Sequence, residues 1–369
     1  MTIVRKFSNK PLHTQVADAL RQDILASYHP GEKMEGEAKF ARRLGVSPFT
    51  LRQAFAVLAY EGLIERRNGS GTYVAGDLER PYITVFTFFD PNAKATDFQT
   101  RIFWLCGSVL RERGYPVRLH VMTEGFQDEE WSPYCRGVAQ GRICGALFIS
   151  LRPGPMATAL AEKAVPYVVT GEGFPYGVSL DDPAILREGT RHLLERGCRK
   201  IAVLGWNGSQ TKDLCLQSLA SFRALLDESG AAYHAEWLRN AVPPNVPGAG
   251  WEQFREIWAA RDEKPDGLLV LDDVLFRDVM LGILDSHIQV PEQLQVVTHA
   301  NKGSGFTYPF PVTTLEIDPD EYVEAMADLL IKLIKKEPME TRMKYIQPHL
   351  LLAGEREERL SKLNNRSET

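Results

Sequence analysis

The stretch RLGVSPFTLRQAFAVLAYEGLIERRNGSGTYVAG, from Arg43 to Gly76, decides the fold of the first part of this chain. Ser47 is a favourable helix N-cap, and Pro48 suits the first helical position, where its missing N–H removes no hydrogen bond. After this pair the apolar side chains recur at the spacing of one helix face: Leu51, Ala54, Phe55 and Leu58. The stretch therefore predicts a helix that starts at the Ser-Pro pair and leaves its opposite face in solvent.

The second half of the stretch, LIERRNGSGTYVAG, alternates apolar and polar residues around an Asn-Gly pair. Such a pair between two alternating runs is the strongest short signal for a β-hairpin. Gly69 and Gly71 allow the hairpin tip to approach a phosphate backbone, and Arg66 and Arg67 supply positive charge beside it. A helix followed by a basic hairpin predicts a winged DNA-binding module. The alternative is a small helical subdomain with a solvated hairpin.

Two more helices are predicted ahead of this stretch. Residues 12–24 carry apolar side chains at helical spacing, and the Pro-Gly pair of YHPGEKM ends that helix. The second helix runs from about Glu35 to Leu44. Gly45 supplies the left-handed residue that a tight turn between helices needs, and Val46 fills the space between them. The predicted order is three helices and then a wing.

In this order, PLHTQVADALRQDIL, PGEKM, FARRLGVSPFTLRQA and LAYEGLIERRNGSGTYV resemble the winged helix-turn-helix of GntR-type bacterial transcription regulators. The resemblance implies duplex DNA as a partner, contacted by Ser47, Phe49, Thr50, Arg52, Gln53, Arg66, Arg67, Asn68 and Gly69. Arg52 matches a DNA-contacting arginine of the family, whereas Ala38 and Pro48 stand where the family has two more. The family's usual operator is therefore not predicted. Phe49 either contacts a thymine methyl group or packs against its own domain.

Charge separates this module from the rest of the chain. The 369 residues carry a net charge of −5, yet residues 1–75 hold 11 Lys and Arg against 7 Asp and Glu, or +4, which leaves −9 for the remainder. Only the N-terminal part therefore attracts phosphates. No apolar run has signal-peptide or membrane-spanning length, so we expect a cytoplasmic protein without a membrane partner. The 5 cysteines are scattered without Cys-x-x-Cys spacing, which argues against disulfides and a zinc site.

Beyond a short polar linker the pattern changes to alternating strands and helices. YITVFTFFD, PVRLHVM, CGALFIS and VPYVVTG have the composition of strands, with helical segments among them. The alternation restarts with GTRHLLERGCRKIAVLGW and continues through PDGLLVLDD and VPEQLQVVTHA. Such alternation implies parallel sheets covered by helices. We expect two α/β lobes with ligand access at the carboxyl ends of the strands.

Residues from about Tyr82 to Gly354 resemble the effector domain of LacI/GalR regulators, a relative of the periplasmic sugar-binding fold. The likeness lies in VSLDDPAILREGTRHLLERGCRKIAVLG, PDGLLVLDDVLFRDVMLGIL, VPEQLQVVT and TTLEIDPDEYVEAMADLLIKLI. A GntR-type reader joined to such a sensor is the arrangement of AraR-like sugar-responsive repressors. We expect a winged helix-turn-helix domain at 1–76, a linker at 77–81, a two-lobed effector-binding and dimerisation domain at 82–355 and a polar tail at 356–369.

The resemblance also implies effector contacts. Asp181 matches the aspartate of the family's Val-Asp-Asn stretch, and Asp272-Asp273 match its Asn-Asp pair, of which Asp273 is our candidate. Aromatic candidates for stacking walls are Phe89, Trp206 and Trp251. Alternatively, the aspartates cap helices or solvate loops, and the aromatic rings belong to the core. Ser218 and Ala300 replace an arginine and an aspartate that often hold sugar in the family.

These features predict a transcription regulator, a repressor by the resemblance, that binds operator DNA as a homodimer and responds to a small, carbohydrate-like effector. An enzyme is the second hypothesis, because Asp181-Asp182 and Asp272-Asp273 are paired carboxylates. Adjacent aspartates on a strand point to opposite faces, however, and the chain lacks phosphate-loop, nucleophile-elbow and zinc-protease motifs. We therefore expect no catalysis, cofactor or metal. The third hypothesis, lobes that only dimerise, stays open because of Ser218 and Ala300.

Overall fold

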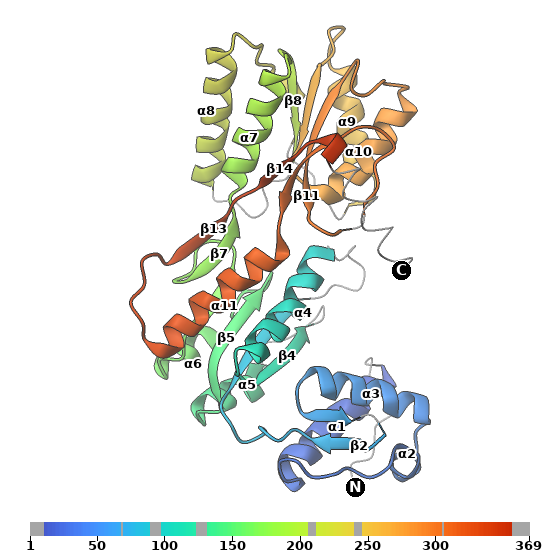
Figure 1. Ribbon diagram of the computed structural model, residues 1–369, viewed down its shortest axis with the longest axis vertical. Coiled ribbons are helices and arrows are strands. Elements are labelled where there is room, and N and C mark those ends of the chain that lie inside the picture. Colours follow the sequence, from blue (N-terminus) through green and yellow to red (C-terminus); the bar gives the residue numbers. More distant parts are fainter. Residues whose placement is uncertain are drawn as a thin grey trace. The chain divides into compact units, whose positions relative to one another are not determined.

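The computed structural model describes residues 11–67, 69–88, 97–122, 131–205, 212–239, 246–304 and 306–355 (Figure 1). These ranges contain a small helical module with a hairpin and two mostly parallel β-sheets. This architecture confirms the predicted α/β fold with an N-terminal winged helix-turn-helix. Three predicted site residues, Asn68, Phe89 and Trp206, and the predicted tail at 356–369 lie outside the described residues.

The N-terminal module consists of α1 (Leu12–Ser27), α2 (Glu37–Leu44), α3 (Pro48–Tyr60), β1 (Ile64–Arg67) and β2 (Gly71–Val74). Helix α2 begins two residues later than predicted, because Gly36 occupies its N-cap with non-helical backbone (φ −59°, ψ 139°). Helix α1 packs on α3. Their apolar faces join that of α2 in one core, in which the rings of Phe40 and Phe55 lie 5.7 Å apart. This core fixes the orientation of α3.

Local signals set the turns as predicted. The Ser47 hydroxyl accepts a hydrogen bond from the Thr50 backbone N–H at 3.0 Å, so it caps α3. Gly45 follows α2 in the left-handed region (φ +68°). In the antiparallel hairpin, Ile64 lies opposite Val74 and Arg67 lies opposite Gly71. The exposed face of α3 and the hairpin therefore follow directly from short-range sequence.

The first sheet has the strand order β13-β7-β6-β5-β3-β4. Its strands are β3 (Tyr82–Phe88), β4 (Val117–Met122), β5 (Ile143–Ile149), β6 (Tyr167–Thr170), β7 (Gly177–Leu180) and β13 (Met343–Ile346). The pairs β3-β4, β3-β5, β5-β6 and β7-β13 are parallel. Four helices lie next to these strands in the sequence: α4 (Asp97–Glu112), α5 (Ser132–Ala139), α6 (Met156–Glu162) and α11 (Pro319–Lys335).

His120 on β4 lies in an aromatic cluster. Its ring stacks on Phe86, with centroids 5.1 Å apart, and meets Tyr134 edge-on at 4.8 Å. The side chain as a whole is only half-buried, but its Nε2 atom is buried without a hydrogen-bond partner among the described residues. Burial lowers the pKa of this imidazole well below its usual range, and the charges of Arg21 and Arg118 act in the same direction. The cluster therefore holds a neutral histidine.

The second sheet has the strand order β14-β12-β11-β10-β8-β9. Its strands are β8 (Ile201–Leu204), β9 (Leu238–Arg239), β10 (Gly267–Val270), β11 (Gln295–Asn301), β12 (Thr313–Ile317) and β14 (His349–Leu351). All pairs are parallel except β12-β14, which is antiparallel. Helices α7 (Asp182–Glu195), α8 (Lys212–Glu228), α9 (Ala249–Ala259) and α10 (Asp273–Asp285) alternate with these strands. Such alternation is the βα pattern that the sequence predicts.

The segment from Met343 to Leu351 contributes the last strand of each sheet. Within it β13 pairs with β7, and β14 pairs with β12 only a few residues later. The sequence analysis assigned no strand to this segment. Neither sheet is therefore complete without residues close to the end of the described chain.

Candidate functional site

The outer face of α3 is open to solvent. Phe49 is 66% exposed, and Arg52 and Gln53 are also exposed. An exposed Phe49 is not part of the module's core, which leaves its ring available for contact with another molecule. The helix thus presents an apolar ring, a guanidinium and an amide, which together suit the edges of bases in a major groove.

Glu37 on α2 lies between two of the predicted DNA-contacting arginines. Its carboxylate is 3.6 Å from Nε of Arg52 on α3 and forms a closer ion pair with Nη2 of Arg66 on β1. All three side chains are at least a third exposed, so the pairs are weak in water. Sequence reasoning did not find Glu37, because the residues it joins are far apart in the chain.

The other wing arginine has different neighbours. The Arg67 guanidinium lies over the ring of Tyr73, 4.3 Å from its centroid, and Lys33 Nζ lies 5.7 Å from the same centroid. The Tyr73 hydroxyl is 2.6 Å from Oγ of Ser70. Two cations from separate segments thus gather on one aromatic ring of the wing.

A buried ion pair joins α1 to the end of α3. Arg21 donates to both carboxylate oxygens of Glu61, at 2.7 and 2.5 Å, and to Asp18 at 2.6 Å. Glu61 is only 7% exposed. Burial raises the pKa of the Glu61 carboxyl, and the bond to Arg21 opposes that shift. Arg21 therefore compensates a carboxylate that would otherwise be isolated from water.

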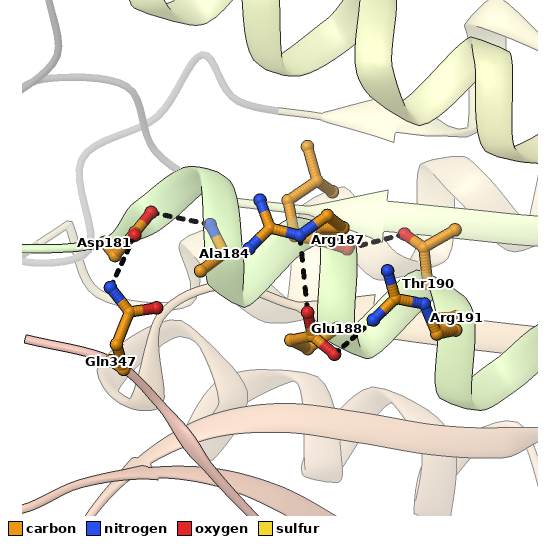
Figure 2. A network of polar contacts seen from close by, with 8 residues as sticks. Asp181, Ala184, Arg187, Glu188, Thr190, Arg191 and Gln347 are labelled. Atoms are coloured by element: carbon orange, nitrogen blue, oxygen red, sulfur yellow. Dashed lines mark hydrogen bonds and ion pairs between the residues drawn. The ribbon is translucent and has the colours of Figure 1, made fainter.

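Among the effector candidates, Asp181 is a helix cap in this structure (Figure 2). One oxygen accepts from the Ala184 backbone N–H at 2.9 Å, and the other accepts from Gln347 Nε2 at 2.7 Å. The carboxylate lies at the carboxyl end of β7, where α7 begins. The alternative interpretation of Asp181, a capping residue, therefore describes its contacts.

The other aspartate candidate, Asp273, lies next to Asp272 where β10 and β11 end. Asp272 caps α10, accepting from the backbone N–H groups of Val274 and Leu275 at 2.9 Å each. Burial raises the pKa of the Asp272 carboxyl, and the charge of Asp273 acts in the same direction. Asp273 accepts from Nδ2 of Asn301 at 3.0 Å.

Two polar atoms beside this pair have no hydrogen-bond partner among the described residues: Oδ1 of Asn301 and Nε2 of His299. Asn301 is 7% exposed and His299 is 6% exposed. Buried polar atoms normally find a partner, so an unpaired donor or acceptor marks a place that a polar ligand or water can satisfy. The sequence analysis missed both residues. Their position at the end of β11, next to β10, was the available signal.

The structure describes only some of the remaining effector positions. Trp251 on α9 is half-buried, with the Arg255 guanidinium 4.6 Å from its ring centroid. Ala300, at the position of a family aspartate, is 2% exposed. The side chain of Ser218 lies outside the described part, as Phe89 and Trp206 do.

Several absences hold for the described part of the chain. No three His, Cys, Asp or Glu side chains in the ranges above come together to hold a metal ion. In the same ranges, no helix is long and apolar enough to cross a membrane. Cys106, Cys135, Cys144 and Cys198 are free thiols.

Comparison with known families identifies both parts. Residues 12–74 match the gntR family of bacterial regulatory proteins, and residues 190–353 match the periplasmic binding protein-like domain. The chain joins a gntR-family helix-turn-helix to a periplasmic-binding-protein-like domain. This confirms the two resemblances that the sequence motifs indicated.

Two named relatives match either most of this chain or a short stretch of it. The arabinose metabolism transcriptional repressor of Halalkalibacterium halodurans is 24% identical over 327 residues, or 84% of this chain and 85% of that protein. The mannosyl-D-glycerate transport/metabolism system repressor of Escherichia coli is 36% identical over 83 residues, covering 22% of this chain and 35% of that protein. The second likeness is thus confined to a short part of each chain.

Solved structures agree on the fold. A complex of the transcriptional regulator CelR with cellobiose superposes with a TM-score of 0.60 at 23% identity, covering 83% of this chain and 90% of that one. A LacI-family regulatory protein from Chloroflexus aggregans gives 0.59 at 16% identity, covering 74% and 98%. At these identities the likeness supports the fold alone.

Proposed function

We propose that this protein is a transcription repressor that binds operator DNA through the winged helix-turn-helix and is controlled by a small effector bound to the α/β lobes. The observation that carries the proposal is the Ser47-capped α3, whose Phe49, Arg52 and Gln53 are exposed beside a basic hairpin. Nothing in the core of the module needs these three side chains. The Halalkalibacterium halodurans relative, which aligns over 84% of this chain, is named as a repressor.

The proposed effector site includes the carboxyl ends of β10 and β11. Asp273 supplies a carboxylate there, and Asn301 and His299 each keep one unpaired polar atom. A mixture of acceptors and donors suits a compound with several hydroxyl groups. The relative named for arabinose metabolism supports the same ligand class. Asp181 and Trp251 remain candidates, and Asp181 can bind ligand only if it exchanges its capping bonds.

Selection of duplexes from a random pool, followed by binding titrations at fixed salt, tests the DNA-binding part. Arg52→Ala should weaken binding to the selected duplex by about 1–3 kcal/mol if its guanidinium meets a base. Arg191→Ala is the matched control, since Arg191 pairs with Glu188 on α7 and carries the same charge. Equal affinities for wild type and Arg52→Ala would contradict the assignment of α3 as the recognition helix.

A thermal-shift screen with sugars, sugar acids and nucleosides tests the effector part. A ligand at about 100 times its dissociation constant should stabilise the native protein by about 2.7 kcal/mol. Asp273→Ala should abolish the shift and leave ligand-free DNA binding intact, whereas Asp285→Ala, at the exposed end of α10, should preserve both. If no compound raises the melting temperature, the proposed effector site is contradicted and the competing function, lobes that only dimerise, gains support.

Homodimerisation is part of the proposal. One winged module of this size contacts one half-site, and a two-fold dimer then matches a near-palindromic operator. Sedimentation of the full chain at micromolar concentration should give a dimer. A strict monomer under those conditions would contradict the proposed homodimer.

A further inference from the structure

Lys33 lies against the wing, although it precedes α2 by several residues. Its backbone forms an antiparallel bridge with Tyr73, and the next residue, Met34, donates its N–H to the Thr72 carbonyl at 2.9 Å. The chain ahead of α2 thus lies beside β2 and pairs with it through this isolated bridge. This pairing fixes where the Lys33 side chain starts.

The Lys33 side chain then passes over Gly71. A Cβ atom at Gly71 would lie 3.3 Å from Cε of Lys33, closer than most such contacts, and Gly71 has a φ of +116°. Glycine at this position therefore leaves room for the lysine stem. The Nζ atom reaches the ring of Tyr73, which also carries the Arg67 guanidinium. A flat ring that attracts cations holds both charges near one point of the wing.

This cluster and the group around Arg66 each hold two cations and one carboxylate. Arg66 shares Glu37 with Arg52, so its charge is opposed by a carboxylate. Among the described residues, Arg67 pairs with Glu65 at 3.2 Å, and the side chains of this pair are 52% and 49% exposed. Among the described residues, no carboxylate forms an ion pair with Lys33. The cluster of Lys33, Arg67 and Tyr73, here called the wing cation cluster, therefore has excess positive charge.

We propose that the wing cation cluster binds one backbone phosphate of duplex DNA, with Lys33 and Arg67 as the contacting cations and Tyr73 as the positioning residue. The proposal rests on the DNA-binding function proposed above and adds Lys33 and Tyr73 to its residues. Phosphate contacts set the position of a reader on the duplex and carry no base preference. The cluster accordingly contributes affinity that is independent of sequence and sensitive to salt.

The test measures binding of the full chain to a duplex selected by the wild type, and to a shuffled duplex of equal composition, over a series of salt concentrations. Loss of one phosphate contact makes the slope of log K against log salt shallower by about 0.9. If the proteins converge near 1 M salt, that slope corresponds to binding about fivefold weaker at 0.15 M. Lys33→Gln should show this change on both duplexes.

Variants of Tyr73 separate positioning from charge. Tyr73→Leu removes no charge and should still reduce the slope, whereas Tyr73→Phe keeps the ring and should restore the wild-type value. Lys39→Gln is the matched control: Lys39 is 80% exposed, pairs with Glu35 at 2.9 Å and lies in the same module. It should reduce the slope less than Lys33→Gln.

Two results would overturn the proposal while leaving the DNA-binding function intact. One is an unchanged slope for Tyr73→Leu that remains folded by circular dichroism. The other is an equal loss for Lys33→Gln and Lys39→Gln, which would indicate general electrostatics. Failure of the wild type to bind any duplex would instead contradict the DNA-binding function itself.

Discussion

Removal of Arg21 should loosen the DNA-reading module more than the lobes. In Arg21→Ala, Glu61 keeps its place at the end of α3, 7% exposed, but loses two hydrogen bonds of 2.7 and 2.5 Å. Breaking a buried pair by removing one partner costs about 3–5 kcal/mol, and the lower end of this range applies here because the Arg21 side chain is 28% exposed. A module of this size has a total stability of the same order. The variant module should therefore be close to unfolding.

Hydrogen exchange of the full chain, followed by mass spectrometry of peptides from α1 and α3, measures this local stability. All 6 tryptophans lie beyond Phe103, so their fluorescence in urea follows unfolding of the lobes, and it should change less than exchange in α1 and α3. Asp18→Ala is the control, since Asp18 is 42% exposed and its pair with Arg21 is worth at most about 1 kcal/mol.

The double variant Arg21→Met/Glu61→Leu should recover most of the loss, because an apolar pair leaves no buried charge. Protection in Arg21→Ala equal to that in Asp18→Ala would refute the reasoning. A double variant as unprotected as the single one would do the same.

Two further outcomes are expected from the fold. Ser47→Ala removes the 3.0 Å cap of α3 and should destabilise the module by about 1 kcal/mol, while Ser47→Asp retains the cap. Amide hydrogen exchange in α3 distinguishes the two variants, and equal protection from exchange would count against the cap. Because the folded-state pKa of His120 lies below its unfolded value, its contribution to stability is full above about pH 6.5 and falls by up to about 1.4 kcal/mol per pH unit below it. His120→Phe should reduce the change of the urea midpoint between pH 7.5 and 5.5. A change equal to that of wild type would show that the pKa of His120 is the same in the folded and unfolded states.

The parts of the molecule that sequence predicted depend on neighbouring residues. Ser47 and Pro48 start a helix, Gly45 closes a turn, and β1 pairs with β2 in a hairpin, each within a short stretch of chain. The alternation of strands and helices is equally local. These features were therefore readable before any tertiary contact was known.

Contacts between distant segments were not readable. Glu37 meets Arg66 across 29 residues, and Asp181 meets Gln347 across 166. Of the adjacent pair Asp272-Asp273, only the structure distinguishes the helix cap from the residue that holds Asn301. Side-chain pairing of this kind depends on how the elements pack, which hydrophobic periodicity does not encode.

The placement of β13 and β14 has a consequence for protein synthesis. All residues of the winged helix-turn-helix have been synthesised once residue 75 has left the ribosome. Both sheets are incomplete until the strands at Met343–Ile346 and His349–Leu351 follow. At translation rates of about 5–20 residues per second, the interval is roughly 15–55 s. During it a nascent chain has a folded DNA reader and unfinished sheets. We expect newly made molecules to contact a single half-site before they can dimerise or sense an effector.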